Sequence, residues 1–277
     1  MIKTISINDY SSNAFELIKN NLLLNKIKIN DKIIIKNEDA NLFLLNSTGF
    51  DYIDIDPFGT PAPFLDSAVK RIARQGILAI TATDTGCLCG SFPKACIRKY
   101  WAAPKKSTVM HETGLRILIR KVQLIGAEHE KALTPIFSYS REHYFRVFFN
   151  CEKGKEKADK IMKQHGLYNE AGPMWLGQLW DTKLASKMLK NNEIEENKRF
   201  LSVINEESKI NTIGFYNIHK IVKKYKLKKI PNKELLMQKI KEAGYKAANT
   251  HFSDISIRSG MPLKKLIDII KKSVRGV

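Results

Sequence analysis

The chain has 277 residues, of which 43% are apolar, enough for one large or two ordinary globular domains with a packed core. This composition excludes a disordered chain, and no apolar run approaches the roughly 18 residues that a membrane span needs. The four cysteines form no C-x-x-C pair and have no histidine at ligand spacing, so the sequence predicts neither structural zinc nor disulfides. No long apolar segment follows Lys3, so no secretory signal is indicated, and the expected location is a reducing cytoplasm.

The net charge of +19 is unevenly distributed along the chain. Residues 1–150 carry 20 basic and 14 acidic side chains, a net +6, whereas residues 151–277 carry 27 and 14, a net +13. Most of that excess follows residue 210. Such an excess favours a polyanion partner, most simply nucleic acid, although a composition rich in Lys, Asn and Ile explains it equally well from charge alone.

Strand and helix patterns alternate through the first 130 residues. The predicted strands cover residues 2–8, 31–39, 50–56 and 76–84. The predicted helices cover residues 13–25, capped by Ser11 or Ser12, 64–76, stopped by Gly76, and 111–131. This alternation predicts a parallel sheet of the α/β class.

The second half of the chain has a different pattern. Strands at 136–140 and 143–152 are close enough to form an antiparallel pair, and a helix over 155–166 and an ordered loop at 172–181 follow. Residues 213–259 then read as helix, helix, strand, strand, an order that resembles a winged helix. A cluster of lysines in it predicts contact with RNA phosphates, namely Lys223, Lys224, Lys226, Lys228 and Lys229. A solvated helix face explains any single one of them equally well.

Four predicted strands end in acidic residues, namely Asp9, Asp39, Asp56 and Asp84. In open α/β sheets the ligand crevice lies beyond the carboxyl ends of the strands, so these carboxylates predict a ligand site. Asp9 is placed to hold a ribose diol. Asp39 is placed to accept from an adenine amino group, beside the backbone N–H of Ala40.

The third strand leads into Asp56-Pro57-Phe58. Pro57 lacks a backbone N–H and so ends the ladder, and a solvated strand end with a turn proline is the ordinary alternative. The Asp56 carboxylate and the Pro57 carbonyl can accept two N–H groups of a base, while Phe58 stacks on it. Two acceptors would orient the lone pair of an exocyclic amine toward a methyl donor, so we expect catalysis by orientation and electrostatics.

These residues carry a family resemblance. D-P-F-G resembles the D/N-P-P-Y/F motif of amino-methyltransferases, and residues 51–68 resemble the tRNA guanine-N2 dimethyltransferases, which modify the guanine at tRNA position 26. Further similar segments keep the family's order, at 37–41, 80–100, 111–119, 138–147, 172–181 and 250–253.

The resemblance implies a class I, Rossmann-like methyltransferase domain over residues 1–150 with S-adenosylmethionine as donor. It implies an α+β tRNA-binding domain with a winged-helix-like end over residues 151–277. By position, Asp9 would hold the donor's ribose and Asp39 with Ala40 its adenine. Asp56, Pro57 and Phe58 would hold the target guanine.

The sequence departs from the family in three places. Archaeal members often carry a four-cysteine zinc knuckle before GP-WLG, but residues 163–173 contain no cysteine, so no metal is expected. Trp101 stands where the family usually has glycine. The family's first strand and glycine-rich loop precede the strand that ends at Asp9, so we expect an incomplete sheet, and a separate N-terminal fragment is a possible partner that supplies them.

Two other functions stay open at this point. A DNA or protein amino-methyltransferase would share the D-P-F residues. A catalytically inactive tRNA-binding module would fit the absence of a glycine-rich loop.

Overall fold

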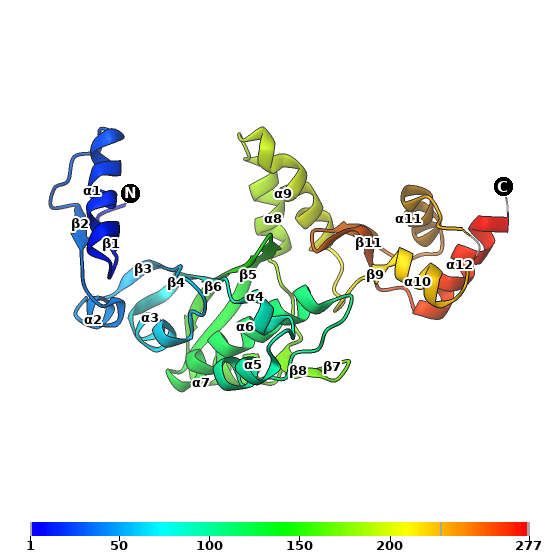
Figure 1. The fold of residues 1–277 in the computed structure, drawn as a ribbon, viewed down its shortest axis with the longest axis horizontal. Helices are drawn as coiled ribbons and strands as arrows, with labels where there is room; N and C mark the ends of the chain where they lie inside the picture. The colour runs from blue at the N-terminus through cyan, green and yellow to red at the C-terminus, as the bar shows by residue number, and fades with distance from the viewer. Residues whose placement is uncertain (1, 228, 276–277) are drawn as a thin grey trace.

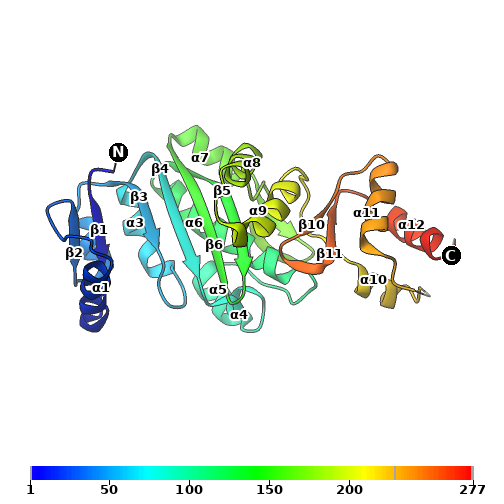
Figure 2. The ribbon, with the colours of Figure 1, turned by 90° about the horizontal axis from the view of Figure 1, so that it is seen from above.

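A four-stranded sheet in the order β3-β4-β6-β5 forms the middle of the molecule (Figures 1 and 2). The computed structural model describes residues 2–227 and 229–275. The strands are β3 (Phe50–Ile55), β4 (Ile72–Ala82), β5 (Lys131–Arg141) and β6 (Tyr144–Lys153). β3 and β4 are parallel, whereas β6 is antiparallel to both β4 and β5, which confirms the predicted antiparallel pair.

Helices lie on both faces of this sheet. Figure 1 shows α3 (Leu65–Arg71), α6 (Met110–Glu128) and α7 (Lys155–Met162) on one face, and α8 (Thr182–Lys190) and α9 (Glu195–Glu207) on the other. Shorter elements complete this part, namely η1 (Ala62–Phe64), α4 (Thr85–Leu88), α5 (Pro93–Tyr100), β7 (His165–Tyr168) and β8 (Ala171–Trp175). Their apolar side chains form one core that runs from Leu44 to Ile204, so elements before and after residue 150 share it.

The N-terminal residues form a separate pair of parallel strands, β1 (Ile5–Asn8) and β2 (Ile33–Lys36), with α1 (Ser12–Leu24) between them. The Ser11 side chain caps α1, as predicted, but no residue of α1 is fully buried. α2 (Ala40–Leu45) joins β2 to β3. In the described residues, no strand pairs with the second edge of β1 or of β3, so the predicted parallel strands lie in two sheets rather than one.

The C-terminal residues pack around a core of their own, built from side chains between Ile218 and Ile270. We call residues 216–275 the C-terminal module. Its elements are β9 (Tyr216–Asn217), α10 (Ile218–Lys224), α11 (Lys233–Glu242), β10 (Ala247–Thr250), β11 (Ser253–Ser259) and α12 (Leu263–Arg275). The predicted order of helix, helix, strand, strand is present, and β9 joins β11 to give an antiparallel sheet.

The predicted helix over 64–76 is wrong after Arg71, where β4 begins. The Lys131 ammonium donates to the carbonyl oxygens of Val69 at 2.6 Å and Ile72 at 2.8 Å, which satisfies acceptors that a continuing helix would otherwise use. Ile72 already pairs with Phe50 of β3. Tertiary contacts therefore override the helical pattern of this segment.

The predicted helix over 155–166 ends early for a similar reason. α7 ends at Met162, and His165 pairs with Trp175 in the two-stranded β7–β8 sheet. The segment 172–181, predicted as an ordered loop, therefore begins as strand β8.

The structure explains why glycine would suit position 101. Trp101 ends α5 in the left-handed conformation, with φ +55° and ψ +40°. A residue with a Cβ pays roughly 1–2 kcal/mol for this conformation, whereas glycine does not. The Lys121 ammonium lies 3.0 Å from the centroid of the Trp101 ring, so a cation–π contact opposes the backbone cost.

The left-handed conformation of residue 101 predicts that a glycine variant is more stable than an alanine variant. Trp101→Gly should be about 1 kcal/mol more stable than Trp101→Ala, because both lose the contact with Lys121 but only alanine keeps the left-handed strain. Urea unfolding of the two variants measures the difference. An alanine variant at least as stable as the glycine variant would contradict the prediction.

Candidate active site

The loop that follows β3 presents Asp56, Pro57 and Phe58 to solvent. Ile53 and Ile55 anchor the strand in the core, whereas Asp56 is exposed and the Phe58 side chain has no protein cover at all. Within the described residues, no donor makes a hydrogen bond to the Asp56 carboxylate. A free carboxylate beside a free aromatic face is suited to accept a base that stacks and donates N–H groups.

The C-terminal end of this loop, at Gly59, is hydrogen-bonded to the residues that follow β4. The Gly59 N–H donates to Thr83 Oγ1 at 2.6 Å, and the Gly59 carbonyl accepts from the Thr83 N–H at 2.9 Å and the Asp84 N–H at 3.3 Å. Gly59 has φ +81°, which a side chain would strain. The loop is therefore held by its backbone while its functional groups remain free.

A buried tyrosine extends this support. The Tyr100 hydroxyl, on α5, donates to Asp84 Oδ1 at 2.6 Å and lies 2.8 Å from Thr60 Oγ1. Tyr100 is fully buried, and burial together with the Asp84 charge holds the pKa of its hydroxyl above the usual range. Lys99 pairs with the other oxygen of Asp84 at 3.2 Å.

Asp84 therefore differs from the other acidic strand ends. Its carboxylate supports the loop from inside and is not free for a ligand. The sequence predicts Asp84 as an acidic strand end but not this use. Tyr100 lies within the segment 80–100 that carries the family resemblance, and no local pattern marks it.

The support by Tyr100 gives a testable prediction. Tyr100→Phe should lower the free energy of unfolding by about 1–3 kcal/mol, because it removes a hydrogen bond to the charged, partly buried carboxylate of Asp84. It should also lower catalytic turnover, by about tenfold, since the loop loses its link to α5. Tyr216→Phe is the control, because its hydroxyl donates to the Met261 carbonyl far from the loop. Equal turnover in both variants would contradict a role in supporting the loop.

Asp9 and Asp39 are brought together by contacts between the segments that follow β1 and β2. The Asn8 side chain bonds to the Glu38 backbone, with Nδ2 donating to its carbonyl at 3.0 Å. The Asn37 amide donates to the Asp9 carbonyl at 2.8 Å. The two acidic residues thus share one end of the β1–β2 sheet, as the sequence predicts for strand ends.

Each of these two carboxylates has one oxygen engaged and one available. Asp9 Oδ1 accepts from the Ser11 N–H at 2.7 Å, and Asp39 Oδ1 accepts from the N–H groups of Asn41 and Leu42 as the N-cap of α2. No described group accepts from the Ala40 N–H. The remaining acceptors and this donor fit the hydroxyls and amine of a nucleoside, although no contact joins them to Asp56.

The described lysines of the predicted RNA-binding cluster are all exposed. Lys223 and Lys224 end α10, and Lys226 and Lys229 follow it. None of these four forms an ion pair in the described residues. Lys228 lies outside the described residues. Exposed ammonium groups without an ion-pair partner suit phosphate contacts, although lysines near a helix C-terminus also interact favourably with the helix dipole.

The cysteines do not form a reactive or metal-binding site. All four are buried, and burial raises the pKa of the Cys89 thiol to about 12. In the part of the chain that the structure describes, no three His, Cys, Asp or Glu side chains are grouped so as to hold a metal. None of the described helices is long and apolar enough to cross a membrane.

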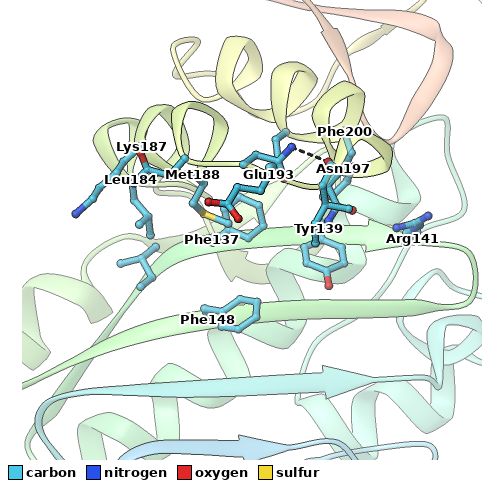
Figure 3. A pocket seen from close by; sticks show the side chains of 15 residues that line it. Phe137, Tyr139, Arg141, Phe148, Leu184, Lys187, Met188, Glu193, Asn197 and Phe200 are labelled. Carbon is cyan, nitrogen blue, oxygen red and sulfur yellow. Dashed lines mark hydrogen bonds between the residues drawn. The ribbon is translucent and has the colours of Figure 1, made fainter. Parts of the chain in front are cut away.

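A pocket of about 820 Å³ lies elsewhere, between β5 and the helices α8 and α9 (Figure 3). Aromatic rings of Phe137, Tyr139, Phe148 and Phe200 line it. None of the predicted site residues lines this pocket. It was not indicated by the sequence.

Comparison with known proteins identifies the fold. The structure of Trm1 from Pyrococcus horikoshii with S-adenosyl-L-methionine superimposes with a TM-score of 0.90 and 32% identity, covering 97% of this chain and 82% of that one. The fold is therefore that of a class I methyltransferase with a C-terminal domain, which confirms the predicted fold class.

The family follows from the sequence matches. The family model for N2,N2-dimethylguanosine tRNA methyltransferase matches residues 1–171 and 164–271, and the chain belongs to this family. The tRNA (guanine(26)-N(2)/guanine(27)-N(2))-dimethyltransferase of Aquifex aeolicus is 38% identical over 94% of this chain and 74% of its own length. The tRNA (guanine(26)-N(2))-dimethyltransferase of Methanobrevibacter smithii is 38% identical over 96% and 77%. The predicted resemblance is confirmed, and the comparisons give no support to a separate N-terminal fragment as a partner.

Proposed function

We propose that this chain transfers methyl groups from S-adenosylmethionine to the exocyclic N2 of guanine 26 in tRNA. The observation that carries this proposal is the Asp56-Pro57-Phe58 loop, whose functional groups are free while Gly59 and Thr60 hold its far side in place. The family membership supplies the reaction class. The inactive tRNA-binding module has no comparable support, because the relatives are named as dimethyltransferases.

The loop would act mainly by orientation. The Asp56 carboxylate would accept an N–H of the guanine N2 amine, and the Pro57 carbonyl a second N–H of the same base edge. Phe58 would stack on the unstacked base. When these acceptors fix the N–H groups on the side of the loop, the lone pair of the amine points away from the loop. This orientation favours in-line attack on the methyl group of the donor.

Asp9, Asp39 and Ala40 would hold the donor. The available oxygen of Asp9 would accept from the ribose hydroxyls, and that of Asp39 from the adenine amine, with the Ala40 N–H donating to a ring nitrogen. S-adenosylmethionine supplies a methyl group on a positively charged sulfur. On transfer to N2 the methyl group would leave the sulfur, and the proton that the amine loses would pass to solvent or to Asp56.

The assignment of methyl transfer and of tRNA binding to different parts of the chain is also a proposal. We propose residues 1–150 as the methyltransferase domain and residues 151–277 as the tRNA-binding part, in which the C-terminal module makes the phosphate contacts. Because β6 crosses residue 150 and the first core continues to Ile204, this boundary divides roles and not packed cores. The two hydrophobic cores support a distinct module after residue 210, since the first core continues to Ile204. The absence of a metal and the cytoplasmic location stay predictions.

One experiment tests the function directly. The purified chain is incubated with methyl-labelled S-adenosylmethionine and a tRNA transcript, or with the same transcript carrying adenine at position 26. We expect N2-methylated guanosine, found by mass spectrometry of the digested RNA, from the first transcript only. Equal labelling of both transcripts would exclude guanine 26 as the target, and no labelling of either would exclude the activity.

A further inference from the structure

Four charged side chains are buried where the C-terminal module meets the rest of the molecule. Glu112 and Arg116 lie on α6, Glu207 lies at the end of α9, and Arg258 lies on β11. The side chains of the two glutamates and of Arg258 are 0% exposed, and that of Arg116 is 2% exposed. Their charges cancel, so the cluster is electrically balanced.

Arg258 is the centre of this cluster. Its Nη2 donates to Glu112 Oε2 at 2.6 Å, and its Nε donates to Glu207 Oε1 at 2.8 Å. Its Nη1 donates to the carbonyl oxygens of Thr212 at 2.7 Å and Gly214 at 3.2 Å, in the segment between α9 and β9. One guanidinium thus joins the module to α6, to α9 and to the connecting segment.

The neighbouring turn of the module repeats the attachment to Glu207. The Thr250 hydroxyl donates to its carboxylate, and His251 Nδ1 lies 2.6 Å from Oε2. The Ser140 N–H donates to His251 Nε2 at 3.3 Å, so the ring is an acceptor on that side and contacts β5 of the central sheet. Burial alone would raise the pKa of Glu207, but the charge of Arg258 and the hydrogen bonds from His251 and Thr250 outweigh it and lower the pKa to about 2.

The helix that Arg258 holds, α6, also packs against α4, the short helix that follows Asp84. Gly114, two residues after Glu112, lies so close to Leu88 that an added Cβ would stand 3.0 Å from its carbonyl oxygen. Leu88 ends α4, which begins directly after Asp84. A fixed chain of packed elements therefore connects the module to the support of the Asp56 loop.

Burying four charges is a costly way to obtain stability, because apolar side chains of similar volume often do as well. The directional hydrogen bonds of Arg258 give instead one defined orientation. We propose that Arg258 is a positioning residue for the tRNA substrate, which sets the orientation of the C-terminal module relative to the Asp56 loop through Glu112 and Glu207. The inference rests on the proposed function.

The test uses Arg258→Lys, which keeps the charge but cannot reach both carboxylates and both carbonyls at once. We expect the turnover number on tRNA to fall by about 10- to 100-fold, since a displacement of about 1 Å is enough for such a loss. The affinity for S-adenosylmethionine and the KM for tRNA should change by less than about threefold, because the donor site and the lysines are intact.

A distance measurement makes the test independent of activity. Spin labels on Asp159→Cys of α7 and Lys264→Cys of α12, both exposed, report the separation of the two parts, and the four native cysteines are buried. The distance distribution should broaden or shift in Arg258→Lys. It should not in Arg146→Lys, a control with the same substitution whose guanidinium donates to Asp54 and Thr81, both in the central sheet and outside the module.

The outcomes separate the two proposals. If the wild-type chain does not methylate tRNA, the proposed function fails, whereas a changed distance distribution in Arg258→Lys still supports the positioning role. The positioning role of Arg258 would be overturned if Arg258→Lys had an unchanged distance distribution or an unchanged turnover number. A variant in which only the KM for tRNA rises would overturn it as well. Should Arg258→Lys not fold, the variant with Arg258→Met, Arg116→Met, Glu112→Gln and Glu207→Gln removes the four buried charges together, and the same outcomes apply to it.

Discussion

Asp56→Ala should lower the rate of methyl transfer to tRNA by at least about 100-fold, the scale of losing one preorganised polar group at a reacting centre. Affinity for tRNA should stay nearly unchanged, because phosphate contacts supply most of the binding free energy and Asp56 makes none. The structure strengthens this expectation, since no described side chain or backbone group uses the Asp56 carboxylate. Its removal therefore leaves no buried partner unsatisfied and should not destabilise the fold.

Two further variants sharpen this test. Asp51→Ala removes an exposed carboxylate from the same strand and should keep wild-type turnover. Asp56→Asn keeps one acceptor oxygen but loses the charge, so its rate should fall between those of wild type and Asp56→Ala. Rates are measured in single-turnover reactions at saturating donor, and tRNA affinity by filter binding. Near-normal turnover of Asp56→Ala would exclude the loop as the holder of the amine.

The sequence located the loop at Asp56-Pro57-Phe58 better than the contacts that support it, because the loop has a local signal; its catalytic role stays a prediction. Proline after a strand and free polar groups leave a signature within three residues, from Asp56 to Phe58. The support for that loop comes from Thr83 and Tyr100, which lie 24 and 40 residues from their partners Gly59 and Thr60. No periodicity marks such a pairing, so the sequence groups Asp84 with the other acidic strand ends and does not show that it holds Tyr100.

The helices and strands that the sequence predicts correctly depend on local patterns, whereas those that it misses depend on contacts between distant residues. The strands β5 and β6 were predicted from their alternation and proximity. The end of α3 was missed because Lys131, some 60 residues further on, contacts its last carbonyls. The contact between Glu112 and Arg258 spans 146 residues, and from the sequence each reads as an ordinary surface charge. Buried ionic contacts between distant segments are therefore what the sequence alone could not show.

The lysines of the C-terminal module should supply much of the phosphate contact with tRNA. Replacing Lys223, Lys224, Lys226 and Lys229 together with glutamine should weaken tRNA binding by at least about tenfold at low salt. The plot of log affinity against log salt should become flatter by about 3, because each neutralised phosphate contributes a slope of roughly 0.7–0.9 through counterion release. Deleting the module is a poorer test, because it would remove Arg258 and leave Glu112 and Glu207 buried beside fewer partners.

A matched control decides between specific contact and charge alone. Lys155, Lys157, Lys160 and Lys163 lie on or next to α7, all exposed, and their replacement by glutamine changes the net charge by the same amount. If the excess charge acts only as a diffuse field, both quadruple variants should lose the same affinity and slope. If the module holds the RNA, the α7 variant should keep nearly the whole slope while the module variant loses about 3. Fluorescence anisotropy with labelled tRNA between about 50 and 200 mM salt measures both, a range over which six to ten phosphate contacts change affinity by roughly 10³–10⁵. Equal slopes in the module variant and the wild type would show that these lysines are a solvated helix face, and the tRNA-binding surface would then have to lie elsewhere on the chain.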